Sequence, residues 1–400
     1  MPLKQDITLN PLGFREYDMR WRYPDDINLE GIFHVGRALG QQLHLHQKTK
    51  IAVGHDFRSY SQDVKNALMA GLSEMGIEVL DIGLSLSPML YFAQFCLGNI
   101  PGAMVTASHN PNGWTGLKTS INPPLTHGPD EMSELKHIAL NTHITPKSGG
   151  SITPVKDIKA QYLDDLVGDF QLSRPLRVVC ATGNGTAGDF APELLNRIGA
   201  KVIERHTELD HRFPHYNPNP EALEMLHDMA DVVQQTKADI ALGFDGDGDR
   251  CGVVDHTGAE IFADKIGLLL ARDYAKHFPA PHFVVDIKST SLFENDPVLH
   301  AHGATVEYWK TGHSHMKRRV AQTGALAGFE KSGHYFIAPP LGHGYDCGLR
   351  VAVELLKLLD RHPDSTLHDL ENALPQSYLS PSMSPFCADD TKYDVVQRLS

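Results

Sequence analysis

The sequence predicts an α/β fold of three consecutive, related domains with helix-flanked mixed sheets around a central cleft. Three observations predict it. The chain has 400 residues, which is too long for one ordinary core. Short apolar runs alternate with helical periodicity in three successive passes. Each pass ends in a polar loop beyond its last strand, where open α/β sheets bind ligands, so we expect the three loops to face one cleft.

The first pass shows the alternation. Val64, Leu68 and Leu72 recur at helical spacing, with Ser61 as the expected N-cap and Gly76 as the stop. Apolar runs on either side predict strands. We expect strands at 51–54, 79–82 and 103–105, and helices at 61–75 and 88–94.

The same order recurs twice. In the second pass Met225, Met229 and Val233 form the apolar side of a helix that precedes a strand. We expect strands at 178–181, 202–204 and 240–244 and helices at 190–198 and 221–235. In the third pass we expect strands at 283–287, 306–309 and 325–328 and helices near 291–302 and 314–321.

Polar, glycine-bearing or turn-rich stretches divide the chain. They predict boundaries near 152, 257 and 373, and therefore units at 1–152, 153–257, 258–373 and 374–400. Near the end, Tyr393, Val396 and Leu399 begin an amphipathic helical pattern.

Charge and cysteine content limit the function classes. The net charge of −13 argues against a nucleic-acid partner or an anionic membrane surface. It allows a small phosphorylated ligand, because a few cationic side chains in one cleft can override the overall sign. Five scattered cysteines without a CxxC pair are typical of a reducing cytoplasm, and no apolar stretch is long enough to span a bilayer. We therefore expect a cytoplasmic protein.

The stretch "GFDGDGDRCG" alternates Asp245, Asp247 and Asp249 with glycines. Carboxylates this close repel one another, so the pattern favours a bound hard cation over an acidic surface turn. An EF-hand does not fit, because its sixth position requires glycine and its twelfth requires glutamate, where this chain has Arg250 and His256. An arginine beside the acids suits a site where metal and cation face a phosphate.

Two other loops carry candidate chemistry. "TASHNPNGWTGLK" holds Ser108 on a tight polar loop after an apolar run, although an ordinary loop would look the same. "GFEKSGHYF" gathers Glu330, Ser332 and His334, which could hydrogen-bond a polyhydroxylated ligand or simply form a polar turn.

Two further stretches give weaker signals. "ATGNGTAG" matches a dinucleotide fingerprint and keeps a dehydrogenase open, but Pro192 would then lie inside the helix. A helix with Asp189 as N-cap and Pro192 in its first turn fits better. "KTGHSHMKRR" adds His313, and its run from Lys317 to Arg319 is interpreted as a solvated helix face.

Seven motifs stand in one order between residue 14 and about residue 350. They are "FREYDMR" at 14–20, "VGHDFRSYS" at 53–61, "TASHNPNGWTGLK" at 106–118, "FDGDGDR" at 244–250, "DIKST" at 286–290, "WKTGHSHMK" at 309–317 and "FEKSGHYF" at 329–336. Together they resemble the α-D-phosphohexomutase superfamily, and most of all its bacterial phosphomannomutase/phosphoglucomutase branch. The resemblance implies that a phosphoryl group on Ser108 is exchanged with hexose 1- and 6-phosphates through a bound 1,6-bisphosphate, which also serves as activator.

The resemblance also implies a role for each unit: a phosphoserine-loop domain at 1–152, a metal-binding domain at 153–257, a sugar-binding domain at 258–373 and the beginning of a truncated C-terminal phosphate-binding domain at 374–400. It implies roles for individual residues as well. Ser108, Asp245, Asp247 and Asp249 would hold one Mg²⁺, and Arg250 would stabilise the transferring group. His109 and Lys118 are the acid–base candidates, with Lys118 favoured because a desolvated lysine can act at neutral pH. The residues implied to bind substrate are Tyr17, Arg20, Lys288, His313, Glu330, Ser332 and His334.

The sequence departs from the family at three places. Trp21 replaces a usual glycine, and Phe329 and Lys331 differ in the sugar-binding turn. The family's fourth-domain phosphate loop is absent from the 400 residues, so we expect weak substrate binding and poor turnover from this chain alone. A serine-dependent metallophosphatase and a sugar-phosphate binder without activity remain alternatives. We expect a monomer.

Overall fold

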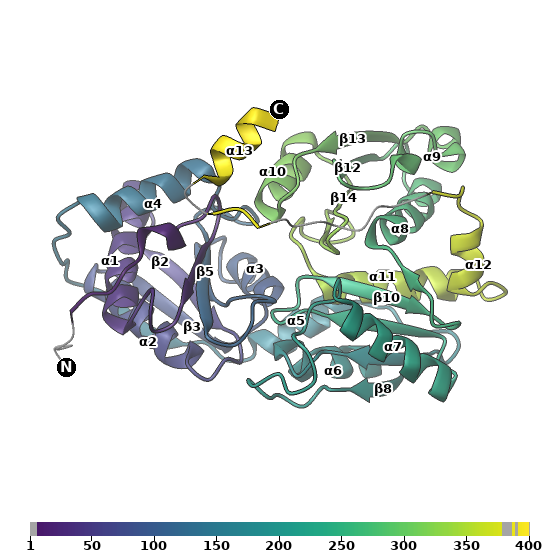
Figure 1. Ribbon diagram of the computed structural model, residues 1–400, viewed down its shortest axis with the longest axis horizontal. Coiled ribbons are helices and arrows are strands. Elements are labelled where there is room, and N and C mark those ends of the chain that lie inside the picture. Colours follow the sequence, from purple (N-terminus) through teal and green to yellow (C-terminus); the bar gives the residue numbers. More distant parts are fainter. Residues whose placement is uncertain (1–5, 378–385, 389–390, 400) are drawn as a thin grey trace.

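The computed structural model describes residues 6–377, 386–388 and 391–399. Three α/β units follow one another, and Figure 1 shows the first beside the second and third, which are stacked on each other. Each unit contains a mixed sheet flanked by helices, which confirms the expected fold class. In the part of the chain that the structure describes, no helix has both the length and the apolarity needed to cross a membrane.

The first sheet has the strand order β1-β5-β4-β2-β3-β6. Its strands are β1 (Met19–Arg22), β2 (Lys50–His55), β3 (Glu78–Leu84), β4 (Gly102–Val105), β5 (Trp114–Ser120) and β6 (Ser151–Pro154). Its helices are α1 (Leu29–Leu45), α2 (Ser61–Glu74), α3 (Ser87–Cys96) and α4 (Pro129–Asn141), after a short 3₁₀ turn η1 (Pro11–Gly13). Strand β2 is parallel to β3 and β4, whereas β5 is antiparallel to β4 and β1.

The second sheet has the order β11-β10-β9-β7-β8. Its strands are β7 (Arg177–Ala181), β8 (Lys201–Arg205), β9 (Ile240–Phe244), β10 (Cys251–Asp255) and β11 (Glu260–Ile261). Its helical segments are α5 (Ile158–Val167), η2 (Thr186–Asp189), α6 (Ala191–Arg197) and α7 (Leu223–Thr236). Strands β9 and β10 are antiparallel, so the loop between them turns back at the end of β9.

The third sheet has the order β13-β12-β14-β15. Its strands are β12 (His282–Asp286), β13 (Thr305–Trp309), β14 (Ala327–Phe329) and β15 (Tyr335–Ile337). Its helical segments are α8 (Ala263–His277), η3 (Ser291–Phe293), α9 (Pro297–Ala301), α10 (His313–Thr323), α11 (Gly348–Arg361) and α12 (Leu367–Asn372). Helix α13 (Lys392–Leu399) follows near the C-terminus.

Helix α11 joins the second and third units. It contacts α5 and α6 on one side and α8 and β15 on the other. Most of its residues are buried, as expected for a helix that is covered on nearly all sides. One continuous apolar core therefore runs from α3 of the first unit through the second sheet to α11, and it fixes the three loops relative to one another.

Three local expectations need correction, and one alternative that the sequence left open loses its structural context. Ser61 is the first residue of α2 rather than its N-cap, and its hydroxyl donates to Asp56 instead. The helix expected near 291–302 is divided, because Asp296 caps a separate α9. Pro192 does lie in the first turn of α6, but the N-cap is Phe190 rather than Asp189. A 3₁₀ turn follows β7, so the helix N-terminus that would bind a dinucleotide pyrophosphate is missing there.

The last expected segment is only partly described. Val396 lies on α13 and is exposed, while the side chains of Tyr393 and Leu399 lie outside the described part of the chain. Residues 378–385 and 389–390 also lie outside it. The truncated fourth domain and the boundaries at 152, 257 and 373 stay predictions.

Candidate active site

Ser108 begins the tight loop that follows β4. Its φ of 51° lies in the left-handed region, which few residues other than glycine adopt. Its backbone N–H donates to Oγ1 of Thr106 at 2.9 Å, which stabilises this conformation. The Ser108 side chain is nearly buried, at 4% exposure. The strand end thus holds one hydroxyl in a fixed and strained position.

Asp56 and Arg58 support the serine loop from the end of β2. The Asp56 carboxylate is paired with the Arg58 guanidinium and accepts a hydrogen bond of 2.8 Å from Thr106. Arg58 Nη2 donates to the backbone oxygens of Ser108 at 3.0 Å and Asn110 at 2.7 Å. Sequence reasoning quoted the motif that contains both residues but assigned them no role. The sequence feature that could have identified them is an Asp and an Arg two residues apart, directly after a buried strand.

Asp245, Asp247 and Asp249 lie on the loop between β9 and β10. All three carboxylates are fully buried, and one ligand atom from each lies within 4.8 Å of the others. Gly248 has a φ of 74°, so it allows the turn that makes the side chains converge. Ser108 Oγ donates to Oδ2 of Asp245 at 3.2 Å, which joins the first and second units directly.

These residues fit a hard divalent cation. Oδ1 of Asp247 is buried and has no hydrogen-bond partner within the described structure, although its Oδ2 accepts one from Ser87 at 2.5 Å. Burial and the neighbouring carboxylates raise the pKa of Asp245 well above its usual value. A cation bound among the three oxygen ligands would relieve this repulsion, and oxygen donors of this kind suit Mg²⁺.

Lys118 extends from β5 into the same carboxylates. Its Nζ donates to Oδ2 of Asp247 at 2.7 Å and is also paired with Asp249. Burial lowers the pKa of Lys118, but the two carboxylates outweigh burial and hold it well above the ordinary value. While the lysine is paired with both carboxylates its pKa is raised, the opposite of the direction that its use as a base assumed, and the acid–base assignment stays a prediction.

His109 is a neutral neighbour of the serine. Its Nδ1 lies 3.3 Å from Ser108 Oγ. The charge of Arg250, together with burial, lowers the pKa of His109 to about 3, and Arg20 contributes in the same direction. The imidazole is therefore uncharged near neutral pH, and the same positive charges oppose its protonation.

The third loop follows β14 and lies against Arg250. Nδ1 of His334 lies 3.1 Å from Oε2 of Glu330 and 3.0 Å from Ser332 Oγ, and its Nε2 lies 3.4 Å from Asp249. Arg250 donates to Nε2 of His334 at 3.3 Å and to Glu221 at 2.8 Å. The loop that we expected to bind sugar is therefore in direct contact with the acidic loop.

Helix α10 brings His313 and Lys317 to this cluster. His313 packs edge-on against Tyr17, with ring centroids 4.8 Å apart. Lys317 is fully buried, and its Nζ donates to Oδ1 of Asp346 at 2.8 Å and lies over the ring of Tyr91. The interpretation of this lysine as part of a solvated helix face is wrong, because the helix turns it inward onto a buried carboxylate.

Arg20 and Lys288 make no hydrogen bond or ion pair with the acidic loop in the part of the chain that the structure describes. Arg20 Nη2 is 3.0 Å from Oδ2 of Asp18, although its charge acts on His109. Lys288 is exposed beyond the end of β12, and no contact given for the described residues joins it to the other predicted site residues. Its assignment to the site stays a prediction.

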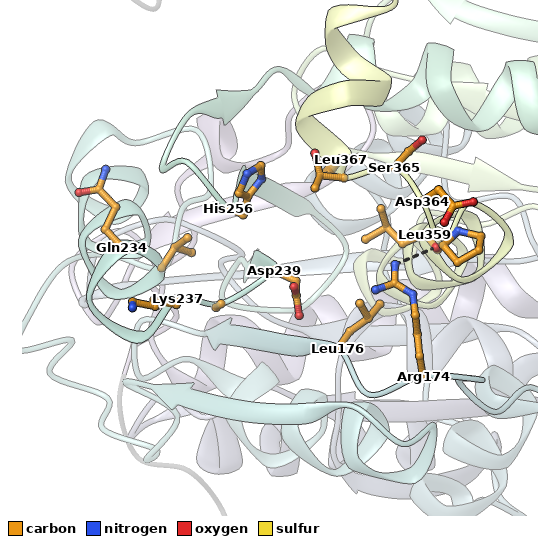
Figure 2. Close-up of a pocket in the computed structure, with 14 residues that line it drawn as sticks. Arg174, Leu176, Gln234, Lys237, Asp239, His256, Leu359, Asp364, Ser365 and Leu367 are labelled. Atoms are coloured by element: carbon orange, nitrogen blue, oxygen red, sulfur yellow. Dashed lines mark hydrogen bonds between the residues drawn. The ribbon is translucent and has the colours of Figure 1, made fainter.

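A separate cavity of about 530 Å³ lies between the C-terminal end of α7 and the connection from α11 to α12 (Figure 2). Arg174, Lys237 and His256 line it with Asp239 and Asp364, and Arg174 donates to the backbone oxygen of Leu359. None of the predicted site residues lines this cavity, so it is not part of the candidate site.

Comparison with known protein families gives one match for each of the three units. Models described as phosphoglucomutase/phosphomannomutase α/β/α domains I, II and III match residues 11–143, 160–258 and 262–378. The chain belongs to the phosphoglucomutase/phosphomannomutase family. The resemblance found in the sequence motifs is thereby confirmed.

Similarity to members of this family extends along the chain. The chain is 35% identical over 386 residues to a phosphomannomutase/phosphoglucomutase of Pseudomonas syringae pv. tomato, and the match covers 96% of this chain and 82% of the relative. It is 34% identical over 373 residues to a phosphoglucomutase of Neisseria gonorrhoeae, covering 93% and 79%. A crystal structure of a phosphoglucomutase/phosphomannomutase family protein from Burkholderia thailandensis matches with a TM-score of 0.86 and 30% identity, over 93% of this chain and 81% of that one.

Proposed function

We propose that this chain is a phosphohexomutase that interconverts hexose 1-phosphate and hexose 6-phosphate, with mannose or glucose as the sugar. The contact of 3.2 Å between Ser108 Oγ and Asp245 carries the proposal, because it joins a strained serine to a buried acidic triplet from another sheet. The names of the relatives support the same activity.

In the proposed reaction, phosphorylated Ser108 donates its phosphoryl group to the free hydroxyl of the bound hexose phosphate. The bond between phosphorus and Ser108 Oγ breaks as the bond to the sugar oxygen forms, and the hydroxyl gives up its proton. The resulting 1,6-bisphosphate reorients and returns its other phosphoryl group to Ser108. Placement of these groups and neutralisation of their charge provide most of the acceleration in phosphoryl transfer.

Ser108 and the three aspartates would hold one Mg²⁺, which when bound would draw charge from the oxygen leaving phosphorus. Arg250 would neutralise the transferring group. His109, whose Nδ1 lies 3.3 Å from Ser108 Oγ, and Lys118 are the two candidates to accept the hydroxyl proton. While it is paired with Asp247 and Asp249, Lys118 is an ammonium group and would stabilise negative charge on the phosphoryl oxygens.

The sugar would lie against the third loop. The same protein groups would hydrogen-bond the sugar hydroxyls in both orientations of the substrate. Two orientations are needed because either end of the substrate must be able to face Ser108. The residues proposed for this contact are Glu330, Ser332, His334, His313, Tyr17, Arg20 and Lys288. We also propose that the protein is a cytoplasmic monomer, which sedimentation of the purified chain and fractionation of its cells would test.

The test measures conversion of glucose 1-phosphate and mannose 1-phosphate with Mg²⁺ and catalytic hexose 1,6-bisphosphate, alongside the intact mass of the protein. We expect isomerisation and one phosphate on Ser108. Ser108→Ala should lose both, while Ser151→Ala, on the exposed β6, should lose neither. Release of inorganic phosphate without the isomeric product would instead identify a metallophosphatase that uses the same serine.

Chelation gives an independent test of the metal. Excess EDTA should stop turnover, and Mg²⁺ should restore it better than Ca²⁺, since Mg²⁺ holds a tighter octahedron around phosphate oxygens. Full turnover in EDTA would overturn the assignment of the three aspartates.

A further inference from the structure

A second group of possible metal ligands lies beside the acidic triplet. It consists of Asp249, His334 and Asp346, and one ligand atom from each lies within 4.8 Å of the others. All three residues are buried. Asp249 belongs to both groups, so a cation in the second group would share a carboxylate with the proposed Mg²⁺ site.

In each of the two carboxylates of this second group, one oxygen is held by a lysine. Lys118 pairs with Oδ2 of Asp249, and Lys317 donates to Oδ1 of Asp346 at 2.8 Å. The other oxygens, Oδ1 of Asp249 and Oδ2 of Asp346, are buried without a hydrogen bond within the described structure. Each of these two oxygens lies near an imidazole nitrogen: Oδ1 of Asp249 is 3.4 Å from Nε2 of His334, and Oδ2 of Asp346 is 3.9 Å from Nδ1 of His313.

Neighbouring carboxylates also orient the imidazole of His334. Its Nδ1 lies 3.1 Å from the Glu330 carboxylate, and its Nε2 lies 3.4 Å from Oδ1 of Asp249. Histidines that bind metals usually donate their second ring N–H to a carboxylate in this way. Nε2 currently accepts a hydrogen bond from Arg250, which retains Glu221 as a partner if that bond is released.

His313 supplies an observation that is independent of the acidic groups. It is 7% exposed, and neither ring nitrogen has a hydrogen-bond partner within the described structure. Its Nδ1 lies 3.9 Å from Oδ2 of Asp346. Buried polar atoms are seldom left unpaired, so this imidazole faces the cluster as a ligand that is available to bind.

We propose that Asp249, His334, Asp346 and His313 form a second cation site, selective for Zn²⁺ and similar ions. Two imidazoles and two carboxylates suit the tetrahedral coordination of Zn²⁺, whereas Mg²⁺ prefers six oxygens. Asp249, His334 and Asp346 have ligand atoms within 4.8 Å of one another, and His313 adjoins them through Asp346. If the proposed function holds, a cation here occupies the two histidines that would contact the sugar. Zn²⁺ therefore inhibits the mutase in competition with hexose phosphate.

The test titrates the full chain, saturated with Mg²⁺, with Co²⁺ as a coloured substitute for Zn²⁺. Tetrahedral Co²⁺ absorbs visible light much more strongly than octahedral Co²⁺. We expect the strong absorption to saturate at one Co²⁺ per chain and to disappear when Zn²⁺ is added. Absorption of only the weak octahedral kind would overturn the proposal.

Two variants test the ligands. His313→Phe and Asp346→Asn should each weaken Co²⁺ binding at least tenfold, while His315→Phe, on the same helix and paired with Glu16, should leave it unchanged. His313→Phe is decisive, because Asp346→Asn also removes the partner of buried Lys317 and can impair folding. Retention of tetrahedral Co²⁺ in folded His313→Phe would exclude His313 as a ligand and overturn the four-ligand site.

Failure of this proposal can be distinguished from failure of the proposed function. Asp247→Asn should weaken the triplet site and retain tetrahedral Co²⁺, because Asp247 is outside the second group. Tetrahedral Co²⁺ in a chain that never phosphorylates Ser108 would support the second site and contradict the mutase. An active mutase that is not inhibited by Zn²⁺ would overturn the second site alone.

Discussion

A side chain on Gly246 would collide with the backbone of Ser108. A Cβ atom at Gly246 would lie 2.5 Å from the Ser108 carbonyl oxygen, closer than such contacts occur. Gly246 lies on the acidic loop of the second unit, and Ser108 lies on the first. The two loops therefore pack backbone against backbone, and this contact allows Ser108 Oγ to reach Asp245.

Gly246→Ala should lower kcat/KM about 100-fold by moving the serine loop away from the aspartates, because small displacements of reacting groups are costly. Gly128→Ala is the matched control away from the site, since the atoms nearest to its Cβ would belong to the guanidinium end of the Arg318 side chain and not to backbone. Steady-state kinetics on both variants, with thermal unfolding to verify the fold, measure the effect. Equal activity of Gly246→Ala and the unsubstituted chain would show that the close approach is unnecessary.

The sequence allowed the two central loops to be predicted because their signals are local. Alternating Asp and Gly residues after an apolar run already favour the convergence of three carboxylates. Ser108 stands out because Asn110, Pro111 and Gly113 interrupt regular structure directly after it. The contact between Ser108 and Asp245 follows once both loops are expected at strand ends facing one cleft.

The supporting residues could not be predicted, because their partners are far away in the sequence. Lys317 lies in a run of three basic residues, and only the position of Asp346 before α11 shows that it is buried. Arg58 reaches the Ser108 carbonyl across 50 residues. Long-range pairs of this kind leave no periodic pattern, so they become visible only when the sheets are assembled.

Loss of Lys317 should destabilise the fold strongly. Lys317→Met leaves the fully buried Asp346 carboxylate without its ammonium, and such a broken pair typically costs about 3–5 kcal/mol. Urea unfolding should show this loss, while Lys310→Met, at an exposed position, should change stability by less than about 0.5 kcal/mol. A change below about 1 kcal/mol for Lys317→Met would mean that Asp346 finds another partner.

His127 should make the fold sensitive to acid. Burial lowers its pKa to about 4, whereas an unfolded histidine titrates near 6.5. Below about pH 6.5 the unfolded chain binds a proton that the folded chain does not, so the free energy of unfolding falls, by up to about 1.4 kcal/mol per pH unit, until about pH 4. His127→Gln should reduce this slope, and His137→Gln, at an exposed position, should not. Parallel pH profiles for His127→Gln and the unsubstituted chain would contradict the assignment.

Lys118 and Mg²⁺ should compete for the same carboxylates. The ammonium group is paired with Asp247 and Asp249, two of the three proposed ligands, so a cation that binds both must displace it or share them with it. Lys118→Met should therefore raise Mg²⁺ affinity about tenfold or more, because it removes a competing positive charge from a buried site. Turnover should fall in the same variant, since the phosphoryl oxygens lose a cationic partner.

Calorimetric titration with Mg²⁺ measures the change in affinity. Lys65→Met is the control, because Lys65 is an equally buried lysine that pairs with Asp81 away from the acidic loop. Weaker Mg²⁺ binding in Lys118→Met would mean that the lysine holds the aspartates in place for the metal instead of opposing it.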